Sequence, residues 1–287
     1  MYNSIVVGYD ESESSRAALK EASLRVRQQG GSLVLVHAVY FDQEEFAILP
    51  SQMEKRFEFG TKVCLQAKKS LNEEFGLNGS VESLVCEGEP HDVLVDIAQT
   101  KKADLIALGT YGRKGLNRLI MGSVTSQVIL NAPCDVLVVK KPCSQCAGTY
   151  HSVLVPYDGS AFSKKALARA CELAKADGAE VSVLYVIPRY EEMMDFFKTD
   201  FIKKSLYQEA EKITEGAEAT ARAHGVRIKS SVLEGHSGDT IVEAAEKGQH
   251  DLIVMATHGW RGFNKALMGS TAERVIAYSS RPILIVK

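Results

Sequence analysis

The chain repeats itself at a spacing of about 147 residues, and this duplication constrains its fold more than any other feature. Segment 4–7 (SIVV) returns as 152–155 (SVLV), and segment 104–106 (DLI) returns unchanged as 251–253. Solenoid repeats run to roughly 20–50 residues, so a period of this length indicates a duplicated domain. The fold must therefore be one that half of this 287-residue chain can adopt on its own, twice over.

The two copies also define the expected domain organisation. We predict a first domain over residues 1–141, a linker over 142–150 and a second domain over 151–287. Domains commonly hold roughly 100–200 residues, so each copy is long enough to bury a core.

Within a copy, short β-branched runs alternate with longer helical patterns. In the first copy, the predicted strands are 4–9, 33–40, 81–86, 104–109 and 135–140, and the predicted helices are 13–29, 53–75, 90–101 and 122–131. Ser160 is a candidate N-cap, and Pro90 suits a first helical turn. Runs such as 137–139 (LVV) are apolar at consecutive positions, as in strands that are covered on both faces. The pattern predicts an α/β fold, in which each copy is a doubly wound, five-stranded parallel sheet of order 3-2-1-4-5 with helices on both faces.

A glycine-spaced segment follows the fourth predicted strand of each copy. The first reads Gly109-Thr110-Tyr111-Gly112, nine residues, then Gly122-Ser123, and the second reads Ala256-Thr257-His258-Gly259, nine residues, then Gly269-Ser270. A glycine-rich loop between a strand and a helix lets backbone N–H groups meet phosphate oxygens. Basic residues inside the nine-residue spans, among them Arg113 and Arg261, would offset phosphate charge.

An aspartate ends the first predicted strand of each copy, at Asp10 and Asp158. In the order 3-2-1-4-5 the first and fourth strands are neighbours, and ligands of such sheets bind outside the carboxyl ends of the strands. A carboxylate is a poor neighbour for phosphate but a good acceptor for sugar hydroxyls or a base amino group. An acid at one end and N–H donors at the other predict a nucleotide site in each copy.

These residues give both copies a resemblance to the universal stress protein family, in its tandem two-domain form. The family's pattern of glycine, two residues, glycine, nine residues, glycine and serine is complete at Gly109, Gly112, Gly122 and Ser123. The resemblance implies binding of ATP or AMP. It assigns Asp10 and Asp158 to the nucleoside, the backbone near Ala38 and Val186 to adenine, and Gly109 to the vicinity of the ribose. It assigns phosphate contacts to Gly112, Gly122, Ser123 and Val124, and to Gly259, Gly269, Ser270 and Thr271.

The second copy departs from the pattern at Ala256, where the first has Gly109. If this position needs a positive φ, alanine costs roughly 1 kcal/mol or more, and its methyl group would crowd a ribose. If φ is negative, little is lost. We expect two competent sites, with the first more secure.

The functional expectation is an adenine-nucleotide-binding, stress-response regulatory or switch module, with ATP or AMP as ligand and Mg²⁺ as an optional companion of ATP. The sequence lacks the glycine-lysine-serine/threonine P-loop of common NTPases, so we expect no dedicated enzyme and assign no catalytic residue, although slow ATP hydrolysis is compatible with the site. The alternatives are an interaction module that needs no nucleotide and a weak ATPase.

Composition limits the classes of partner that we expect for the chain and the cellular compartment in which we expect it. A net charge of −2 gives no case for nucleic acid, and no apolar stretch approaches the roughly 18–20 residues of a membrane span. Met1 leads directly into a strand pattern without a basic leader, so we expect no signal peptide. Six scattered cysteines fit a reducing cytoplasm.

Two further features allow two interpretations each, and a third concerns pairing. Cys143 and Cys146 in the predicted linker are reduced thiols or, with Cys134 and His151 beside them, part of a metal or redox site; we assign no metal. Segments 41–60 and 189–205 are rich in Phe and Met, and form either helix core or a lid or partner surface.

The last strand of each copy, 136–140 and 283–287, would be an apolar edge of its sheet. In the family that the chain resembles, such strands pair the two halves as a pseudo-dimer. The resemblance therefore leads us to expect this pairing, and homodimers of the chain.

The remaining cysteines and histidines have a simpler interpretation. Cys64, Cys86 and Cys171 lie on apolar faces and are expected in the core. His91, His224, His236 and His250 are expected at the surface or in turns.

Overall fold

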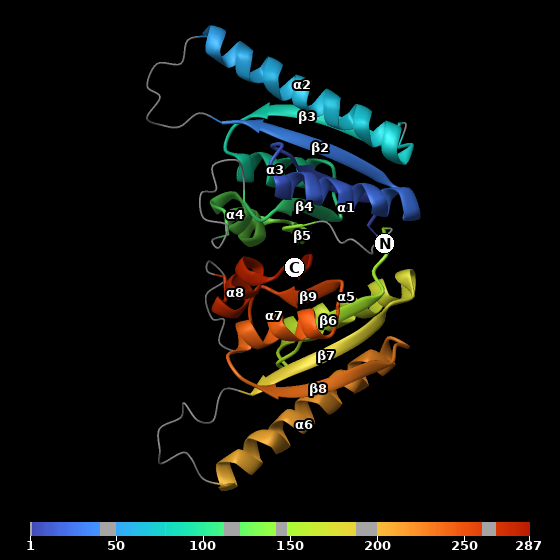
Figure 1. Cartoon of the computed structure of the whole chain (residues 1–287), viewed down its shortest axis with the longest axis vertical. Coiled ribbons are helices and arrows are strands. Elements are labelled where there is room, and N and C mark those ends of the chain that lie inside the picture. Colours follow the sequence, from blue (N-terminus) through green and yellow to red (C-terminus); the bar gives the residue numbers. More distant parts are fainter. Residues whose placement is uncertain are drawn as a thin grey trace. The chain divides into compact units, whose positions relative to one another are not determined.

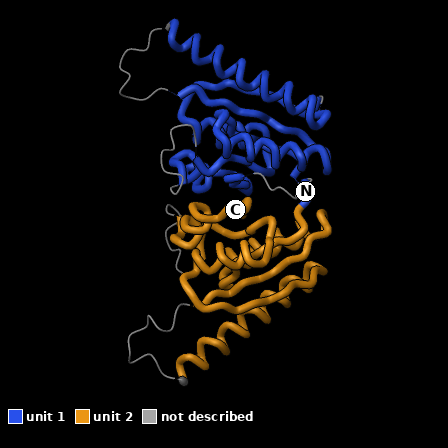
Figure 2. Tube along the Cα trace, viewed as in Figure 1, with its two compact units in different colours: residues 1–149, 287 blue, residues 150–286 orange. Residues whose placement is uncertain are grey.

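The chain forms two compact units, residues 1–149 with 287 and residues 150–286 (Figures 1 and 2). The computed structural model of the chain describes residues 2–40, 50–77, 79–111, 121–141, 148–187, 200–259 and 268–287. Residues 142–147 of the predicted linker lie outside these ranges, as do most of the aromatic and methionine residues of segments 41–60 and 189–205.

Unit 1 alternates strands and helices from its first residues. In chain order the elements are β1 (Ser4–Gly8), α1 (Glu13–Gln29), β2 (Ser32–Val39), α2 (Pro50–Phe75), β3 (Val81–Glu87), α3 (Pro90–Thr100), β4 (Leu105–Gly109), α4 (Ser123–Asn131) and β5 (Asp135–Val139). The predicted elements match closely, and Pro90 stands in the first turn of α3 as expected. The one larger difference is α2, which begins three residues earlier than predicted, at Pro50, where proline's fixed φ suits a first turn.

Unit 2 repeats this order. Its elements are β6 (Ser152–Pro156), α5 (Ala161–Asp177), β7 (Glu180–Ile187), α6 (Asp200–Ala223), β8 (Ile228–Glu234), α7 (Ser237–Lys247), β9 (Leu252–Ala256), α8 (Ser270–Tyr278) and β10 (Ile283–Val286). Ser160 caps α5, since its hydroxyl accepts a hydrogen bond from the Ser163 N–H at 3.1 Å. The predicted N-cap is therefore confirmed.

The strands of unit 1 run parallel in the order β3-β2-β1-β4-β5, and those of unit 2 in the order β8-β7-β6-β9-β10. The predicted order 3-2-1-4-5 is thus confirmed in both units. The connections from β1 to β2 and from β2 to β3 run toward one edge of the sheet. The connections from β3 to β4 and from β4 to β5 run toward the opposite edge. Right-handed crossovers then place α1 and α2 on one face and α3 and α4 on the other, and α1 packs on α2 as α3 packs on α4.

The core of each unit lies on both faces of its central strands. Ile5, Leu33, Leu105 and Ile106 are fully buried in unit 1, and Leu154, Leu184 and Leu252 are fully buried in unit 2. Burying such a side chain contributes roughly 1.5–3 kcal/mol, and the contiguous apolar runs of the strands provide it on each face. None of the helices in the described ranges combines the length and apolar character that crossing a bilayer requires.

The duplication extends to the polar contacts that hold the amino ends of the strands. Asp104, before β4, accepts hydrogen bonds from the N–H groups of Asn3 and Ser4 at 2.9 and 3.1 Å. Asp251 does the same for His151 and Ser152 at 2.7 and 3.0 Å. A charged acceptor makes these stronger than neutral hydrogen bonds, so each pair joins the fourth strand of its unit to the first.

Two residues differ from the sequence-based expectation. His250 is not a surface or turn residue: it is 8% exposed, and its Nδ1 lies 2.8 Å from the Ser152 Oγ. It replaces the buried Ala103 of unit 1, so the copies fill the same place with different side chains. Among the cysteines, Cys64 and Cys171 are buried as expected, whereas Cys86 is only partly buried. Burial raises the pKa of Cys171 to about 11.

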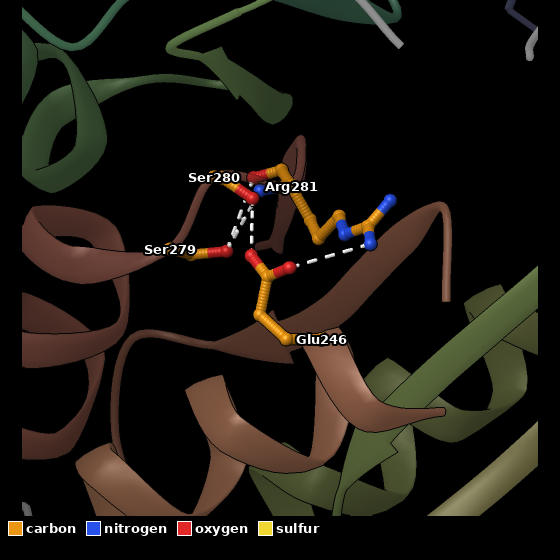
Figure 3. A network of polar contacts seen from close by, with 4 residues as sticks. All are labelled: Glu246, Ser279, Ser280 and Arg281. Carbon is orange, nitrogen blue, oxygen red and sulfur yellow. Dashed lines mark hydrogen bonds and ion pairs between the residues drawn. The ribbon is translucent and has the colours of Figure 1, made fainter. Parts of the chain in front are cut away.

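A polar network in unit 2 joins the end of α7 to the connection between α8 and β10 (Figure 3). The Glu246 carboxylate accepts a hydrogen bond from the Ser280 hydroxyl and pairs with the Arg281 guanidinium at 3.4 Å. The buried Ser279 hydroxyl accepts from the Arg281 N–H at 3.0 Å. These contacts fix the chain as it enters β10.

We predict that unit 2 loses stability on mild acidification because of His250. Burial, with Arg281 and Lys229 nearby, holds the pKa of His250 below its ordinary value. As the pH falls below about 6.5, the unfolded chain takes up a proton that the folded chain resists. The stabilisation is therefore present above the ordinary pKa and is lost below it.

The measurement is the midpoint of urea unfolding at about pH 7.5 and at about pH 5, on either side of the ordinary histidine pKa. We expect a smaller pH dependence in His250→Ala, which copies the residue of unit 1. An unchanged pH dependence in this variant would contradict the assignment.

Candidate functional site

Both units place the same aspartate turn between the first strand and the first helix. Asp10 Oδ1 accepts a hydrogen bond from the Ser12 N–H at 3.0 Å, and Ser12 caps α1 by accepting from the Ser15 N–H at 3.2 Å. In unit 2, Asp158 and Ser160 make the equivalent contacts at 3.0 and 3.1 Å. The turn holds each carboxylate at the carboxyl end of the central strand, half-buried beside a helix N-terminus.

The middle residue of this turn has a left-handed backbone in both units. Gly159 has φ 80° and its counterpart Glu11 has φ 65°. Glycine adopts this conformation without cost, whereas a side chain pays roughly 1–2 kcal/mol. Unit 1 therefore keeps a strained residue next to Asp10 where unit 2 has relieved the strain.

Gly109, at the end of β4, lies against the start of α1. Its φ is not positive, and a Cβ built on it would overlap the Ser14 Oγ and lie 2.8 Å from the Ser14 backbone carbonyl carbon. Ser14 is completely buried, and its hydroxyl donates to the Tyr111 carbonyl oxygen at 2.6 Å. Close approach of strand and helix, and not a positive φ, is thus the reason for glycine at this position.

Ala256 takes the place of Gly109 in unit 2, and its surroundings have changed with it. The counterpart of Ser14 is Phe162, which is 37% exposed, and its ring lies 5.8 Å from the ring of His258. The concern about a positive φ at Ala256 does not apply, because φ is not positive there either. Unit 2 accommodates the methyl group together with a different helix residue.

The second glycine of the pattern meets the aspartate in unit 2. A Cβ on Gly259 would overlap the Asp158 carboxylate, so a larger residue here would displace that side chain. The loop and the aspartate that were predicted to share a crevice are therefore in contact at the carboxyl ends of β6 and β9. The equivalent Gly112, together with Arg113 and Arg261, lies outside the described residues.

The third glycine of the pattern is the N-cap of the fourth helix in both units. Gly122 has φ −64° and its N–H donates to the Thr110 carbonyl oxygen at 2.9 Å; Gly269 has φ −67° and donates to Thr257 at 3.0 Å. Neither helix has a side-chain N-cap hydrogen bond. The first N–H groups of the helices, at Ser123 and Val124 and at Ser270 and Thr271, are thus not capped by a side chain and favour an anion.

The end of the second strand completes the site edge. The Tyr9 N–H donates to the Val36 carbonyl oxygen at 2.9 Å, and His37 Nδ1 lies 2.8 Å from the Tyr9 carbonyl oxygen. Ala38 follows directly and is half-buried, as is its counterpart Val186. In unit 2, burial raises the pKa of Tyr185, and the negative charges of Glu209 and Asp158 raise it further.

The hydroxyls that support the loops were not among the predicted site residues. Besides Ser14, Thr125 donates from its Oγ1 to the Gly109 carbonyl oxygen at 2.8 Å. Thr110 is 5% exposed, and its Oγ1 has no hydrogen-bond partner in the described part of the chain. Comparing the two copies position by position would have singled out Ser14 with Phe162, because this exchange accompanies that of Gly109 with Ala256.

Comparison with known proteins gives one consistent result. A family model described as the universal stress protein family matches residues 1–140 and again residues 149–287. A universal stress protein of Methanocaldococcus jannaschii is 36% identical over 140 residues, which cover 48% of this chain and 82% of that protein. One of Mycobacterium tuberculosis is 27% identical over 293 residues, which cover 99% of this chain and 96% of that protein.

A solved structure supports the fold over the full length. The crystal structure of a universal stress protein from Archaeoglobus fulgidus covers 99% of this chain and 96% of its own, with a TM-score of 0.73 and 20% identity.

Exchanging the residues of the aspartate turn should shift the stability of the two units in opposite directions. We expect Gly159→Ala to destabilise the chain by about 1 kcal/mol, because alanine must adopt a positive φ. Glu11→Gly removes this strain and is expected to be neutral or stabilising by up to about 1 kcal/mol. Urea unfolding of both variants measures the effect, and destabilisation by Glu11→Gly of similar size would contradict the strain at Glu11.

Gly109→Ala should destabilise the chain much more than Ala256→Gly, the reverse substitution at the corresponding position of unit 2. The added methyl group overlaps Ser14, and overpacking of this kind costs roughly 1–3 kcal/mol. Ala256→Gly removes a half-buried methyl group and should cost under about 1 kcal/mol. Thermal unfolding of both variants makes the comparison, and equal midpoints would show that helix α1 does not constrain position 109.

Proposed function

The chain belongs to the universal stress protein family, and we propose that each of its two units binds an adenine nucleotide, ATP or AMP, at the carboxyl ends of its strands. The nucleoside would lie at the aspartate turn and the second strand, and the phosphates at the N-terminus of the fourth helix. Each unit brings these elements to one edge of its sheet, which is where ligands of doubly wound sheets bind.

One observation carries the proposal: in unit 2 the loop glycine Gly259 touches the carboxylate of Asp158. A carboxylate accepts hydrogen bonds from ribose hydroxyls or a base amino group, and it repels phosphate. The Gly269 N–H, which donates to the Thr257 carbonyl oxygen, holds the start of α8 beside the same strand end, and the first N–H groups of α8 favour an anion. An acceptor and an anion site at one strand end suit a nucleoside with phosphate attached.

Unit 1 supports the same assignment with its own contacts. Asp10 is held by the Ser12 N–H in the same turn, and Gly122 caps α4 without a side chain that would compete for the helix N–H groups. The first turn of α4 carries no acidic residue, so the partial positive charge of the helix end is available to a phosphate. In this proposal Mg²⁺ enters with the phosphates of ATP and is assigned no protein ligand.

The proposed role is regulatory rather than enzymatic, in keeping with a stress-response protein that changes shape or partner as its nucleotide changes. A ligand shifts a conformational equilibrium only by its different affinity for the two states. Hydrogen exchange of the full chain with ATP, with AMP and without nucleotide would detect such a shift. The proposal includes a homodimer of the chain, which mass measurement in solution tests directly.

Gly122→Asp and Gly269→Asp should each weaken binding in one unit, to the point where titration no longer detects that site, without unfolding the unit. Aspartate is a favoured N-cap residue, so the helix keeps its start while the new carboxylate occupies the N–H groups and repels phosphate. We expect calorimetric titration with ATP and AMP to give two sites in the unaltered chain and one in each variant, with affinity at the altered site reduced about tenfold or more.

Gly216→Asp is the matched control, because Gly216 lies in α6 and nothing approaches its Cβ position within 4 Å. It should leave both sites intact. Binding that survives in the double variant Gly122→Asp, Gly269→Asp would overturn the site assignment. A chain that binds no adenine nucleotide at all would favour an interaction module that works without one.

A further inference from the structure

We infer that the two units take different ligands: unit 1 takes the nucleoside triphosphate, and unit 2 takes the nucleotide with a single phosphate. This inference rests on the proposed function and goes beyond it, because the proposed function assigns the same ligands to both units. Its basis is a set of differences between corresponding residues at the phosphate end, each of which favours negative charge in unit 1 or disfavours it in unit 2.

The first difference concerns carbonyl oxygens at the loop. In unit 1 the Thr125 hydroxyl donates to the Gly109 carbonyl oxygen at 2.8 Å, and the Ser14 hydroxyl donates to that of Tyr111 at 2.6 Å. Each bond offsets the negative end of a carbonyl dipole that would otherwise repel a phosphate. Unit 2 has Ala272 and Phe162 at the corresponding positions, so neither side chain can donate.

The second difference concerns a buried hydroxyl beside the helix start. Thr110 is 5% exposed, its carbonyl oxygen accepts from the Gly122 N–H, and its Oγ1 has no hydrogen-bond partner in the described ranges. A buried hydroxyl without a partner costs roughly 1–3 kcal/mol, and an added acceptor would recover that cost. In unit 2 the Thr257 hydroxyl is already engaged by His258 Nδ1 at 2.8 Å.

The third difference is a charge at the helix N-terminus. The first turn of α8 carries Glu273, whereas the first turn of α4 has no acidic residue and has Ser126 at the corresponding position. A carboxylate there already interacts with the positive end of the helix dipole. Its repulsion of a ligand grows with the number of phosphates, so it penalises ATP more than AMP.

The ring pair at the unit 2 loop acts in the same direction. Phe162 is 37% exposed and lies against His258, where unit 1 has the fully buried Ser14. The apolar Phe162 ring beside a polyphosphate removes water from its charges without supplying donors in return, in contrast to the Ser14 hydroxyl of unit 1. It is compatible with a nucleoside that carries one phosphate.

The test measures each unit by itself, in the full chain, by calorimetric titration. Gly269→Asp leaves the unit 1 site and Gly122→Asp leaves the unit 2 site, and each protein is titrated with ATP and with AMP at low and at physiological salt. We expect the ratio of ATP affinity to AMP affinity to be about tenfold higher for unit 1, from two or three contributions of a few-fold each.

Reciprocal substitutions then test the residues. In the Gly122→Asp chain, which keeps the unit 2 site, Glu273→Ser should raise ATP affinity about three- to fivefold and AMP affinity by less. In the Gly269→Asp chain, which keeps the unit 1 site, Ser126→Glu should lower ATP affinity by a similar factor. Both effects should shrink as salt rises. Glu215→Ser removes an exposed acidic residue of α6 and is the matched control; it should change neither affinity.

The outcomes separate this inference from the proposed function. If neither single-site protein binds any adenine nucleotide, the proposed function fails. If both bind with the same ratio of ATP to AMP affinity, or if unit 2 has the higher ratio, nucleotide binding stands and the inference is overturned. A changed ratio without any response to the exchange at positions 126 and 273 would overturn the role of the helix charge.

Discussion

The central strand of each unit is buried on both of its faces, and the arrangement of the unit depends on that burial. β1 and β6 present three consecutive buried residues, so helices must cover both sides and the chain must cross the sheet in both directions. The reversal takes place beside the central strand. The residues that follow this strand therefore lie where the fourth strand also ends, and an aspartate there is brought beside the glycine loop without any further long-range contact.

At this edge of the sheet, the backbone groups are shared by the two units, whereas the side chains that contact them differ. The aspartate turn and the glycine N-cap of the fourth helix recur in both units with matching hydrogen bonds. The side chains that differ, Ser14 and Phe162 above all, are those that contact the loops from the first helix. The common framework thus places the same backbone groups at the carboxyl ends of the strands in both units, and the exchange of a few supporting residues changes the side chains around them.

Much of the fold could be predicted from the sequence, because the evidence for it is local. Contiguous apolar runs identify buried parallel strands, Ser160 identifies a helix start, and the repeat applies every assignment twice. The reason for glycine at position 109 could not be predicted, since it depends on Ser14, which is far away in sequence and is pressed against it by the sheet topology. His250 was assigned to the surface for a similar reason: nothing next to it in sequence indicates that the Ser152 hydroxyl is its buried partner.

The contact between Gly109 and Ser14 also limits the order in which such a site can change. A methyl group on the strand is blocked while the helix keeps a serine packed against it, so the strand residue and the helix residue do not vary independently. Two copies that began with glycine and serine could reach the alanine and phenylalanine of unit 2 only if the helix residue changed first or the two changed together. In the packing of unit 1, an alanine at position 109 therefore requires a change at position 14, so the effect of one substitution depends on the other.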